Sequence, residues 1–349
     1  MKIGIPLETI SGETRVAMVP GMVTAFTRLE HEVIIQKNAG ANSFISDDEF
    51  VKAGASIVDD AKSLFAGADV IFKVQPPSTD EVKMMKDGAI YMGYLAPLSN
   101  HETLNAMNAK KVTSFATEFI PRISRAQSMD TLSSMATLAG YKAVLISANH
   151  LGKIFPLLMT AAGSIPPATT FILGAGVAGL QAIATAKRLG SRVEAFDPRP
   201  AVEEQVKSLG ATFVHMEVPE ENVETTGGYA KQQSDAFLIA EQEAIGARLP
   251  KVDVIITTAQ IFGKAAPILI TEEMVKMMRP GSVIVDLAIE GGGNCELSEA
   301  GKTVVKHGVT IVGTLNLPAT LPINGSGMFS KNLLNLFKNI FQNEDNSLD

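Results

Sequence analysis

A glycine-rich turn between an apolar strand and a helix constrains this chain more than any other feature. The turn, Gly174-Ala175-Gly176-Val177-Ala178-Gly179, follows the apolar pair 172–173 and precedes a helical pattern in 180–186. In a GxGxxG turn the first glycine permits a tight bend, the second lets a diphosphate approach the backbone, and the third lets the helix pack closely on the sheet. The helix N-terminus adds unpaired N–H groups and a partial positive charge. The sequence therefore predicts a dinucleotide site with contacts at Gly174, Gly176, Val177, Ala178 and Gly179.

An acidic residue stands where a dinucleotide fold selects its coenzyme. The expected strand 192–196 ends at Asp197, at the interval of about 20 residues after the glycines that such folds use. A carboxylate there accepts hydrogen bonds from the ribose hydroxyls of NAD and repels the 2′-phosphate of NADP. Arg199, which follows Pro198, either pairs with such a phosphate, neutralises Asp197 or is a solvated loop cation. This chemistry favours NAD(H), with Asp197, Pro198 and Arg199 as candidate contacts.

Composition narrows the class of protein. A chain of 349 residues with 46% hydrophobic content can form two domains with sizeable cores. Its net charge of −7 argues against a nucleic-acid partner. The single cysteine, Cys295, excludes an internal disulfide and a multi-cysteine metal site, so we expect no metal. The N-terminal residues lack the pattern of a signal peptide, which favours a reducing compartment.

Residues 154–186 contain no charged side chain, and this run is longer than a membrane-spanning helix needs. Pro166-Pro167, Gly163 and the glycines of the turn would interrupt any single helix through it. We therefore expect a loop, a buried strand and a coenzyme-facing helix in this run, and no transmembrane segment.

Strands and helices alternate before residue 120 and again after the glycine turn, which predicts an α/β protein. We expect two Rossmann-like, doubly wound parallel-sheet domains, separated by a cleft and joined by long helices. A first domain, catalytic or docking, would comprise 1–130 plus 320–349, and an NAD-binding domain would comprise 131–319. The expected strands are 2–5, 33–36, 70–74, 89–92, 112–115, 192–196, 211–215, 252–258, 282–287 and 309–312, with a long helix in 131–152 and an amphipathic one in 328–341.

The segment 121–134 is unusually dense in short polar groups and lies between the two expected domains. One interpretation is the start of a helix, which Ser128 or Asp130 caps, with solvated arginines. The other interpretation places polar groups along the cleft that faces the glycine turn, where they would hold the carboxamide and ring of a nicotinamide. The candidates are Arg122, Gln127, Asp130 and Ser133.

At these residues the chain resembles a known family. The run 122–134, with Gly140-Tyr141-Lys142-Ala143 and 227–231, is similar to the NAD(H)-binding component of the Re/Si-specific, proton-translocating NAD(P)+ transhydrogenase. The resemblance implies a homodimeric component that binds NAD(H) and exchanges hydride directly with NADP(H) on a separate component. It also implies docking on a proton-channel membrane component, and hence a cytoplasmic protein that is peripheral on the inner membrane.

The resemblance also implies roles for individual residues. The family's nicotinamide contacts map onto Arg122, Gln127, Asp130 and Ser133, beside Leu132, and its ribose acid maps onto Asp197. Thr258 and Ala259 match positions near the nucleotide, whereas the loop 260–267 departs from the family's Leu-Ile-Pro-Gly-Lys-Pro-Ala-Pro. Tyr229 matches a mobile-loop tyrosine, and is either a lid residue or an ordinary loop aromatic.

Alanine dehydrogenase shares this architecture and is the main alternative. Arg15 and Lys73 stand where that family holds its substrate, although both are also candidates for structural cations that pair with Glu8 or Glu118. The stretch 91–97 lacks that family's catalytic histidine. Oxidative deamination needs a group that titrates near neutrality, whereas hydride transfer between two nicotinamides needs only proximity and alignment. The sequence favours the transhydrogenase.

A third hypothesis is an NAD-binding redox sensor without catalysis. The sequence contains no pattern of a DNA-binding motif, and its acidic balance weighs against this class.

Overall fold

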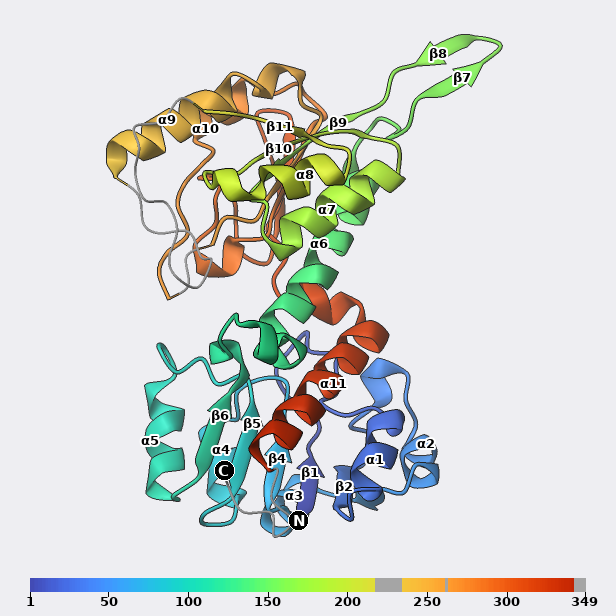
Figure 1. Cartoon of the computed structure of the whole chain (residues 1–349), viewed down its shortest axis with the longest axis vertical. Coiled ribbons are helices and arrows are strands. Elements are labelled where there is room, and N and C mark those ends of the chain that lie inside the picture. Colours follow the sequence, from blue (N-terminus) through green and yellow to red (C-terminus); the bar gives the residue numbers. More distant parts are fainter. Residues whose placement is uncertain (217–233, 261–262, 342–349) are drawn as a thin grey trace. The chain divides into compact units, whose positions relative to one another are not determined.

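The computed structural model describes residues 1–216, 234–260 and 263–341 (Figure 1). The chain divides into two compact units. Unit 1 comprises Met1–Met135 and Pro318–Asp349, and unit 2 comprises Ala136–Leu317. Each unit is built on a mainly parallel sheet with helices, which confirms the predicted α/β class with two doubly wound sheets.

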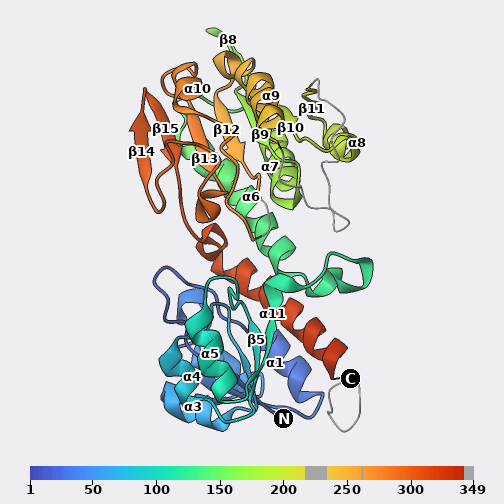
Figure 2. The same cartoon turned by 90° about the vertical axis from the view of Figure 1, so that its left-hand side faces the viewer.

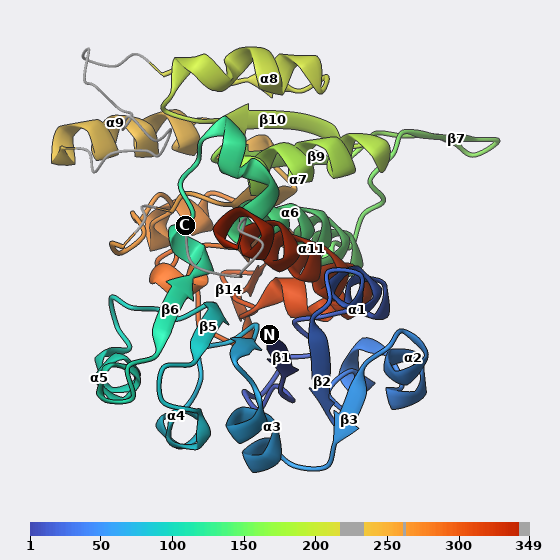
Figure 3. The ribbon, with the colours of Figure 1, turned by 60° about the horizontal axis from the view of Figure 1, so that its bottom comes forward.

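The sheet of unit 1 has the strand order β3-β2-β1-β4-β5-β6, and all its neighbours pair in parallel (Figure 3). The order reverses between β1 and β4, as in dinucleotide-binding folds. The strands of unit 1 are β1 (Lys2–Ile5), β2 (Glu32–Gln36), β3 (Ser56–Val58), β4 (Val70–Phe72), β5 (Ile90–Gly93) and β6 (Thr113–Ala116). Its helices are α1 (Pro20–Thr27), α2 (Asp47–Lys52), α3 (Ala61–Gly67), α4 (Thr79–Met84), α5 (His101–Ala109) and α11 (Pro322–Ile340).

The C-terminal helix α11 completes unit 1. Its Phe337 packs edge-on against Phe26 of α1 and Phe72 of β4, with ring centroids 5.1 and 6.1 Å apart. Its Ser326 hydroxyl accepts a hydrogen bond from the backbone N–H of Val16 (3.0 Å). The helix therefore begins at Pro322, six residues earlier than the amphipathic pattern predicts, because its first turns pack through small and polar residues.

Unit 2 has the strand order β11-β10-β9-β12-β13-β15-β14, and only the edge strand β14 pairs antiparallel among these strands (Figure 2). Its order reverses between β9 and β12. The strands are β9 (Thr169–Leu173), β10 (Arg192–Phe196), β11 (Thr212–Phe213), β12 (Val254–Thr257), β13 (Val283–Asp286), β14 (Thr303–Lys306) and β15 (Val309–Val312). The helices are α6 (Thr131–His150), which starts in unit 1, and α7 (Val177–Arg188), α8 (Glu203–Ser208), α9 (Asp235–Gly246) and α10 (Glu272–Lys276).

Both faces of this sheet are covered by apolar cores. Ile172 belongs to the cluster that contains residues of α6, α7 and α8, whereas its neighbours Phe171 and Leu173 belong to the cluster with α9 and α10. Alternate residues of one strand therefore enter different cores, which explains why the strands read as continuous apolar runs.

The long uncharged run contains several short elements rather than one helix. It holds a hairpin of β7 (Leu158–Thr160) and β8 (Gly163–Ile165), then β9, then the start of α7. The prediction of interrupted structure in this run is confirmed. No helix in the described part of the chain combines the length and apolar character that a bilayer crossing requires.

We expect Gly140→Ala to destabilise unit 2. Gly140 lies within α6, and a Cβ there would overlap the carbonyl oxygen of Ala178 in the first turn of α7. Alanine gains about 1 kcal/mol of helix propensity over glycine, but overpacking against backbone costs about 1–3 kcal/mol. Urea unfolding should show a net loss for G140A. Gly246→Ala is the matched control, because the described residues outside its own helix and chain neighbours leave the Cβ position clear to 4 Å. Equal stability of G140A and the wild type would contradict this packing.

Candidate dinucleotide-binding site

The three glycines of the turn differ in what surrounds them, and so in why glycine stands at each position. Gly174 has a φ of +96°, and a Cβ there would lie 2.5 Å from Thr258 Oγ1. A Cβ on Gly179 would overlap the carbonyl oxygen of Gly174. Around Gly176, by contrast, no atom of a described residue lies within 4 Å of the Cβ position, apart from its chain neighbours and its own helix backbone. The first and third glycines are thus required by the fold, whereas the second borders open space that a ligand could occupy.

Helix α7 begins at this open space. Its N-cap is Gly176, and no side chain caps the helix there. The first N–H groups of a helix have no partner within the helix, and they carry the positive end of its dipole. An anion beside Gly176 would therefore meet N–H donors and a favourable field.

Asp197 is buried, and its carboxylate is fully engaged. Oδ2 accepts from the Ala175 N–H (2.7 Å) and from Arg199 Nη2 (2.8 Å). Oδ1 accepts from the backbone N–H (2.9 Å) and Nε (2.8 Å) of Arg199. Of the three alternatives for Arg199, the structure therefore contains the neutralising pair. Because a carboxylate offers about four acceptor positions, a ribose hydroxyl would have to replace one of these donors.

The loop after β12 is tied to the glycine turn. Thr258 donates its backbone N–H to Leu173 O (2.8 Å) and its hydroxyl to Gly174 O (3.0 Å). Ala259 is held by Asn294, whose Oδ1 accepts the Ala259 N–H (3.0 Å) and whose Nδ2 donates to Ala259 O (2.8 Å). These bonds place Thr258 and Ala259 beside the first glycine.

Asn294 is held in turn by a buried carboxylate, Asp286, which sequence reasoning missed. Asp286 accepts hydrogen bonds from the backbone N–H groups of Asn294 (2.9 Å) and Cys295 (3.0 Å), and from the Thr257 hydroxyl (2.8 Å). Burial raises the pKa of the Cys295 thiol to about 11, so the thiol stays protonated. The glycine run 291–293 signals a tight turn here, but a sequence gives no sign of these partners.

The described part of the altered loop 260–267 is also anchored. Gln260 Nε2 donates to Leu287 O (3.0 Å), the Ala266 N–H donates to Gly291 O (2.8 Å), and Pro267 O accepts from Asn294 (2.8 Å). Residues 261–262, and the candidate lid residue Tyr229, lie outside the described residues.

The polar segment of unit 1 forms a 3₁₀ turn, Ser124–Met129, followed by the start of α6. Asp130 caps this helix, because its carboxylate accepts the Ser133 N–H (2.9 Å) and the Ser133 hydroxyl (2.6 Å). The carbonyl of Ser128 accepts from Asn332 (2.8 Å) and from Asn335 (3.0 Å) of α11.

The capping interpretation therefore holds for Asp130. It does not account for Arg122 and Gln127, whose side chains are exposed, or for Leu132, which is half-buried.

Arg15 and Lys73 are the two cations that suggested alanine dehydrogenase as the alternative. Both are buried in ion pairs within unit 1. Lys73 Nζ lies 2.8 Å from Glu8 and 3.6 Å from Glu81, and Arg15 lies 2.6 Å from Glu13. Burial acts to raise the pKa of Glu13, but the hydrogen bonds and charge of Arg15 outweigh it and bring the pKa to about 2. Lys73 thus pairs with Glu8, one of its two expected partners, whereas Arg15 pairs with Glu13, which was not expected.

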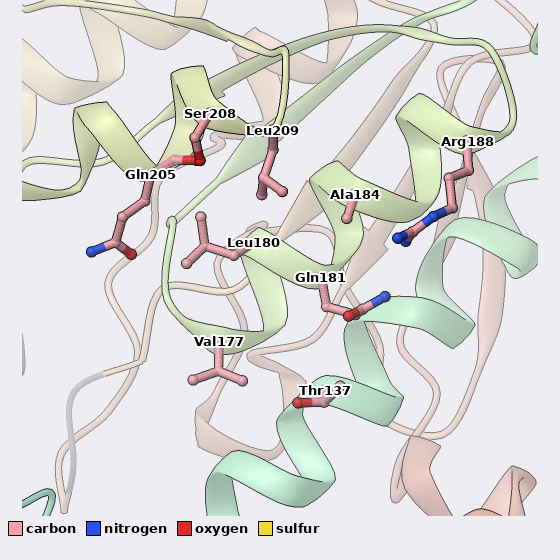
Figure 4. Close-up of a pocket in the computed structure, with 9 residues that line it drawn as sticks. All are labelled: Thr137, Val177, Leu180, Gln181, Ala184, Arg188, Gln205, Ser208 and Leu209. Carbon is pink, nitrogen blue, oxygen red and sulfur yellow. The ribbon is translucent and has the colours of Figure 1, made fainter. Parts of the chain in front are cut away.

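The glycine turn contributes one residue, Val177, to the lining of a groove in unit 2. This groove of about 500 Å³ lies between α6, α7 and α8, and Leu180, Gln181 and Arg188 also point into it from α7 (Figure 4). A smaller hollow of about 80 Å³ at the ends of β10 and β11 includes Asp197 in its lining. The glycines 174, 176 and 179 line neither of them.

Two doubly wound units in one chain, one with a GxGxxG turn followed by an acid, define a two-domain Rossmann protein of the nucleotide-binding type. The chain belongs to the alanine dehydrogenase/PNT family. The family model "Alanine dehydrogenase/PNT, N-terminal domain" matches residues 4–139, and the model of the C-terminal domain matches residues 143–348.

Individual relatives are similar over nearly the whole chain. The chain is 51% identical over 341 residues to the NAD(P) transhydrogenase subunit alpha (first part) of Rhodospirillum rubrum, covering 96% of this chain and 89% of the relative. It is 42% identical to the solved transhydrogenase of Sinorhizobium meliloti, with a TM-score of 0.88 over 98% of this chain and 95% of that one. Alanine dehydrogenase of Methanococcus maripaludis is 33% identical, covering 92% of this chain and 82% of the relative.

The geometry of the turn predicts different effects on stability and on NADH binding when alanine replaces Gly176 or Gly179. Gly176→Ala should leave the unfolding temperature unchanged, because its methyl group enters open space, but should weaken NADH binding about tenfold or more, about 1.4 kcal/mol. Gly179→Ala should lower the unfolding temperature, because its methyl group overlaps the Gly174 carbonyl. Thermal unfolding and NADH titration of both variants test this. A G176A protein that binds NADH like the wild type would contradict the assignment.

Proposed function

We propose that this chain is the NAD(H)-binding component of a Re/Si-specific, proton-translocating NAD(P)+ transhydrogenase. It would transfer hydride directly between NADH and NADP+ held on a separate component, coupled to proton movement by a membrane component. The observation that carries the proposal is the open space at Gly176, at the start of an uncapped helix, next to the buried acid Asp197. The name of the R. rubrum relative, a subunit of an NAD(P) transhydrogenase, supports the existence of partner components. We also propose that docking on the membrane component holds the chain peripherally on the cytoplasmic side of the inner membrane.

We assign the coenzyme contacts as follows. The diphosphate lies at the N-terminus of α7 against Gly174, Gly176 and Gly179, with Val177 and Ala178 as N–H donors. Asp197, Pro198 and Arg199 face the adenosine ribose. The remaining contacts are Thr258, Ala259 and the lid residue Tyr229 for the nucleotide, and Arg122, Gln127, Asp130, Leu132 and Ser133 for the nicotinamide.

The domain roles follow from this assignment. Residues 131–319 form the NAD-binding domain, and residues 1–130 with 320–349 form the catalytic or docking domain.

The proposed hydride transfer requires the protein mainly to position the reacting rings. Bound NADH supplies the hydride. The side chains orient the ring and exclude water, because hydride transfer between two nicotinamide rings moves no proton on nitrogen or oxygen. An amide at position 127 and a hydroxyl at 133 suit that task.

The ion pairs of unit 1 argue against an amino-acid dehydrogenase. A substrate carboxylate would have to share Arg15 with Glu13 or Lys73 with Glu8, and each pair is buried. A second carboxylate beside such a pair would be repelled by the one already there. The redox-sensor alternative requires the same NAD(H) site, and only hydride transfer separates it from the proposal.

Hydride transfer with an NADP(H)-binding component of a related transhydrogenase tests the function. The chain has no tryptophan, so bound NADH can be followed by fluorescence without that background. Rapid mixing of the NADH-loaded chain with the NADP+-loaded component should oxidise NADH. Gln127→Ala should slow this transfer by about 10- to 100-fold through lost ring orientation, while NADH affinity stays within a few-fold. Ser124→Ala, in the same 3₁₀ turn, is the control.

Three results would contradict the proposal. Alanine-dependent reduction of NAD+ by the chain alone would indicate an alanine dehydrogenase. NADH binding without any transfer to NADP+ would indicate a sensor. Failure to bind NADH would remove the coenzyme assignment itself.

The hairpin β7–β8 supports the homodimer that we also propose. It projects from the rest of unit 2 (Figures 1 and 3). Leu157, Leu158, Met159 and Ile165 are exposed, Met159 by 78%. An isolated two-stranded sheet is marginally stable in water, and clustered exposed apolar side chains mark contact surfaces. A second copy of the chain would cover them.

Met159→Asp should weaken self-association. A charge buried in an apolar contact costs enough to dissociate a dimer at micromolar concentration. Sedimentation should show a dimer for the wild type and a monomer for M159D. Val305→Asp, an exposed apolar residue on the edge strand β14, should remain dimeric. An M159D dimer as tight as the wild type would place the interface elsewhere.

A further inference from the structure

The smaller hollow of unit 2, at the carboxyl ends of β10 and β11, is lined by two acids. Asp197 is one of them, and Glu203, the first residue of helix α8, is the other. His215, which follows β11, belongs to the same lining. Dinucleotide folds hold their coenzyme outside the carboxyl ends of the parallel strands. Glu203 and His215 therefore lie where they can act on a group that projects from a ribose at Asp197.

Glu203 is bonded to two basic side chains beside this hollow. Its Oε1 lies 2.6 Å from Lys207 Nζ, one turn further along α8, and 3.2 Å from His215 Nε2. The ring of His215 also packs edge-on against Phe213, with ring centroids 5.2 Å apart. The hydrogen bond from Lys207 is the main cause of a lowered pKa at Glu203, so this carboxylate is ionised at neutral pH.

The ribose acid is matched by a basic group as well, because Arg199 Nη2 lies 2.8 Å from Asp197 Oδ2. Each of these basic groups thus already faces a carboxylate of the protein. A 2′-phosphate is bound through charge-assisted hydrogen bonds from groups of the same kind. A phosphate in the hollow would have to compete with Asp197 for the arginine. It would also have to compete with Glu203 for the lysine and the histidine.

The two sets of pairs differ in how readily they can change partner. The pair of Asp197 and Arg199 is largely buried, so the fold fixes it. The side chains of Lys207 and His215, by contrast, are 62% and 68% exposed. Exposed ion pairs contribute little to stability, so these two side chains could turn to a ligand if Glu203 did not hold them. Glu203 is therefore the residue that decides whether basic groups are available at this hollow.

We propose that Glu203 is a specificity-determining residue of the coenzyme site, which keeps Lys207 and His215 from serving as ligands of the 2′-phosphate of NADP(H). The proposal rests on the proposed function, because it takes the adenosine ribose to lie at Asp197. The carboxylate acts in two ways: it engages the basic side chains, and its own charge repels the phosphate. Asp197 accepts the ribose hydroxyls, and Glu203 excludes the phosphate that replaces one of them.

Displacement of bound NADH from the full chain tests this. NAD+ and NADP+ differ only in the 2′-phosphate, and the loss of NADH fluorescence gives a Kd for each. The measured quantity is the ratio of the Kd for NADP+ to the Kd for NAD+. In about 0.1 M salt, Glu203→Gln should lower this ratio about fivefold relative to the wild type, the size expected for one partly screened charge. Glu203→Lys, which reverses the charge, should lower it further, by about tenfold or more.

Salt and a neighbouring acid provide the controls. In about 1 M salt the Debye length falls to about 3 Å, so E203Q and the wild type should agree within about twofold. A fault of folding would not disappear with salt in this way. Glu204→Gln removes the same charge from the next position of α8, which is exposed and does not line the hollow. Its ratio should stay within about twofold of the wild type in 0.1 M salt.

Three results would overturn this proposal alone. One is an equal ratio for the wild type and E203Q in 0.1 M salt, with NAD+ binding intact. Another is a drop in E204Q as large as that in E203Q, because the effect would then come from net charge and not from the hollow. The third is a wild type that binds NADP+ as tightly as NAD+. A wild type that binds neither NADH nor NAD+ would overturn the proposed function itself.

Discussion

The close seating of helix α7 on the glycine turn is the constraint on which the site depends. Gly179 brings the helix against the Gly174 carbonyl, and Gly174 brings the turn against Thr258. Because the backbone is drawn in at these two points, the helix N-terminus opens onto free space at Gly176. Asn294 donates a hydrogen bond to Ala259 O, and Asp286 accepts one from the Asn294 N–H. These bonds hold the loop that follows β12 in place. The fold thus presents backbone N–H groups at this opening, and side chains serve mainly to keep that backbone in place.

Charge at this site is a property of several residues together. Asp197 and Arg199 compensate each other in an ion pair. In unit 1, Arg15 and Lys73 are each buried against a carboxylate. Cations that an amino-acid dehydrogenase would offer to its substrate are therefore engaged internally.

The sequence predicted the elements with strong local signals: the strand-turn-helix unit at 172–186, the acid at 197 and the long helix from 131. It did not predict β3, α3, α4, α10, β14 or the hairpin β7–β8, because short elements depend on caps and on distant strands more than on periodicity. Site details were limited in the same way. Three-dimensional proximity decides which partner a side chain has. It determines that Asp130 caps α6, that Arg199 pairs with Asp197 and that Arg15 pairs with Glu13.

The central claim is that the protein supplies geometry to a hydride transfer and no acid or base. Tracing an isotope measures this most directly. NADH that carries deuterium at the transferred position would be mixed with this chain and an NADP+-loaded partner component in ordinary water. The account predicts that all of the transferred deuterium appears in NADPH, because the hydride never visits an exchangeable group. Deuterium released to water during turnover would contradict it.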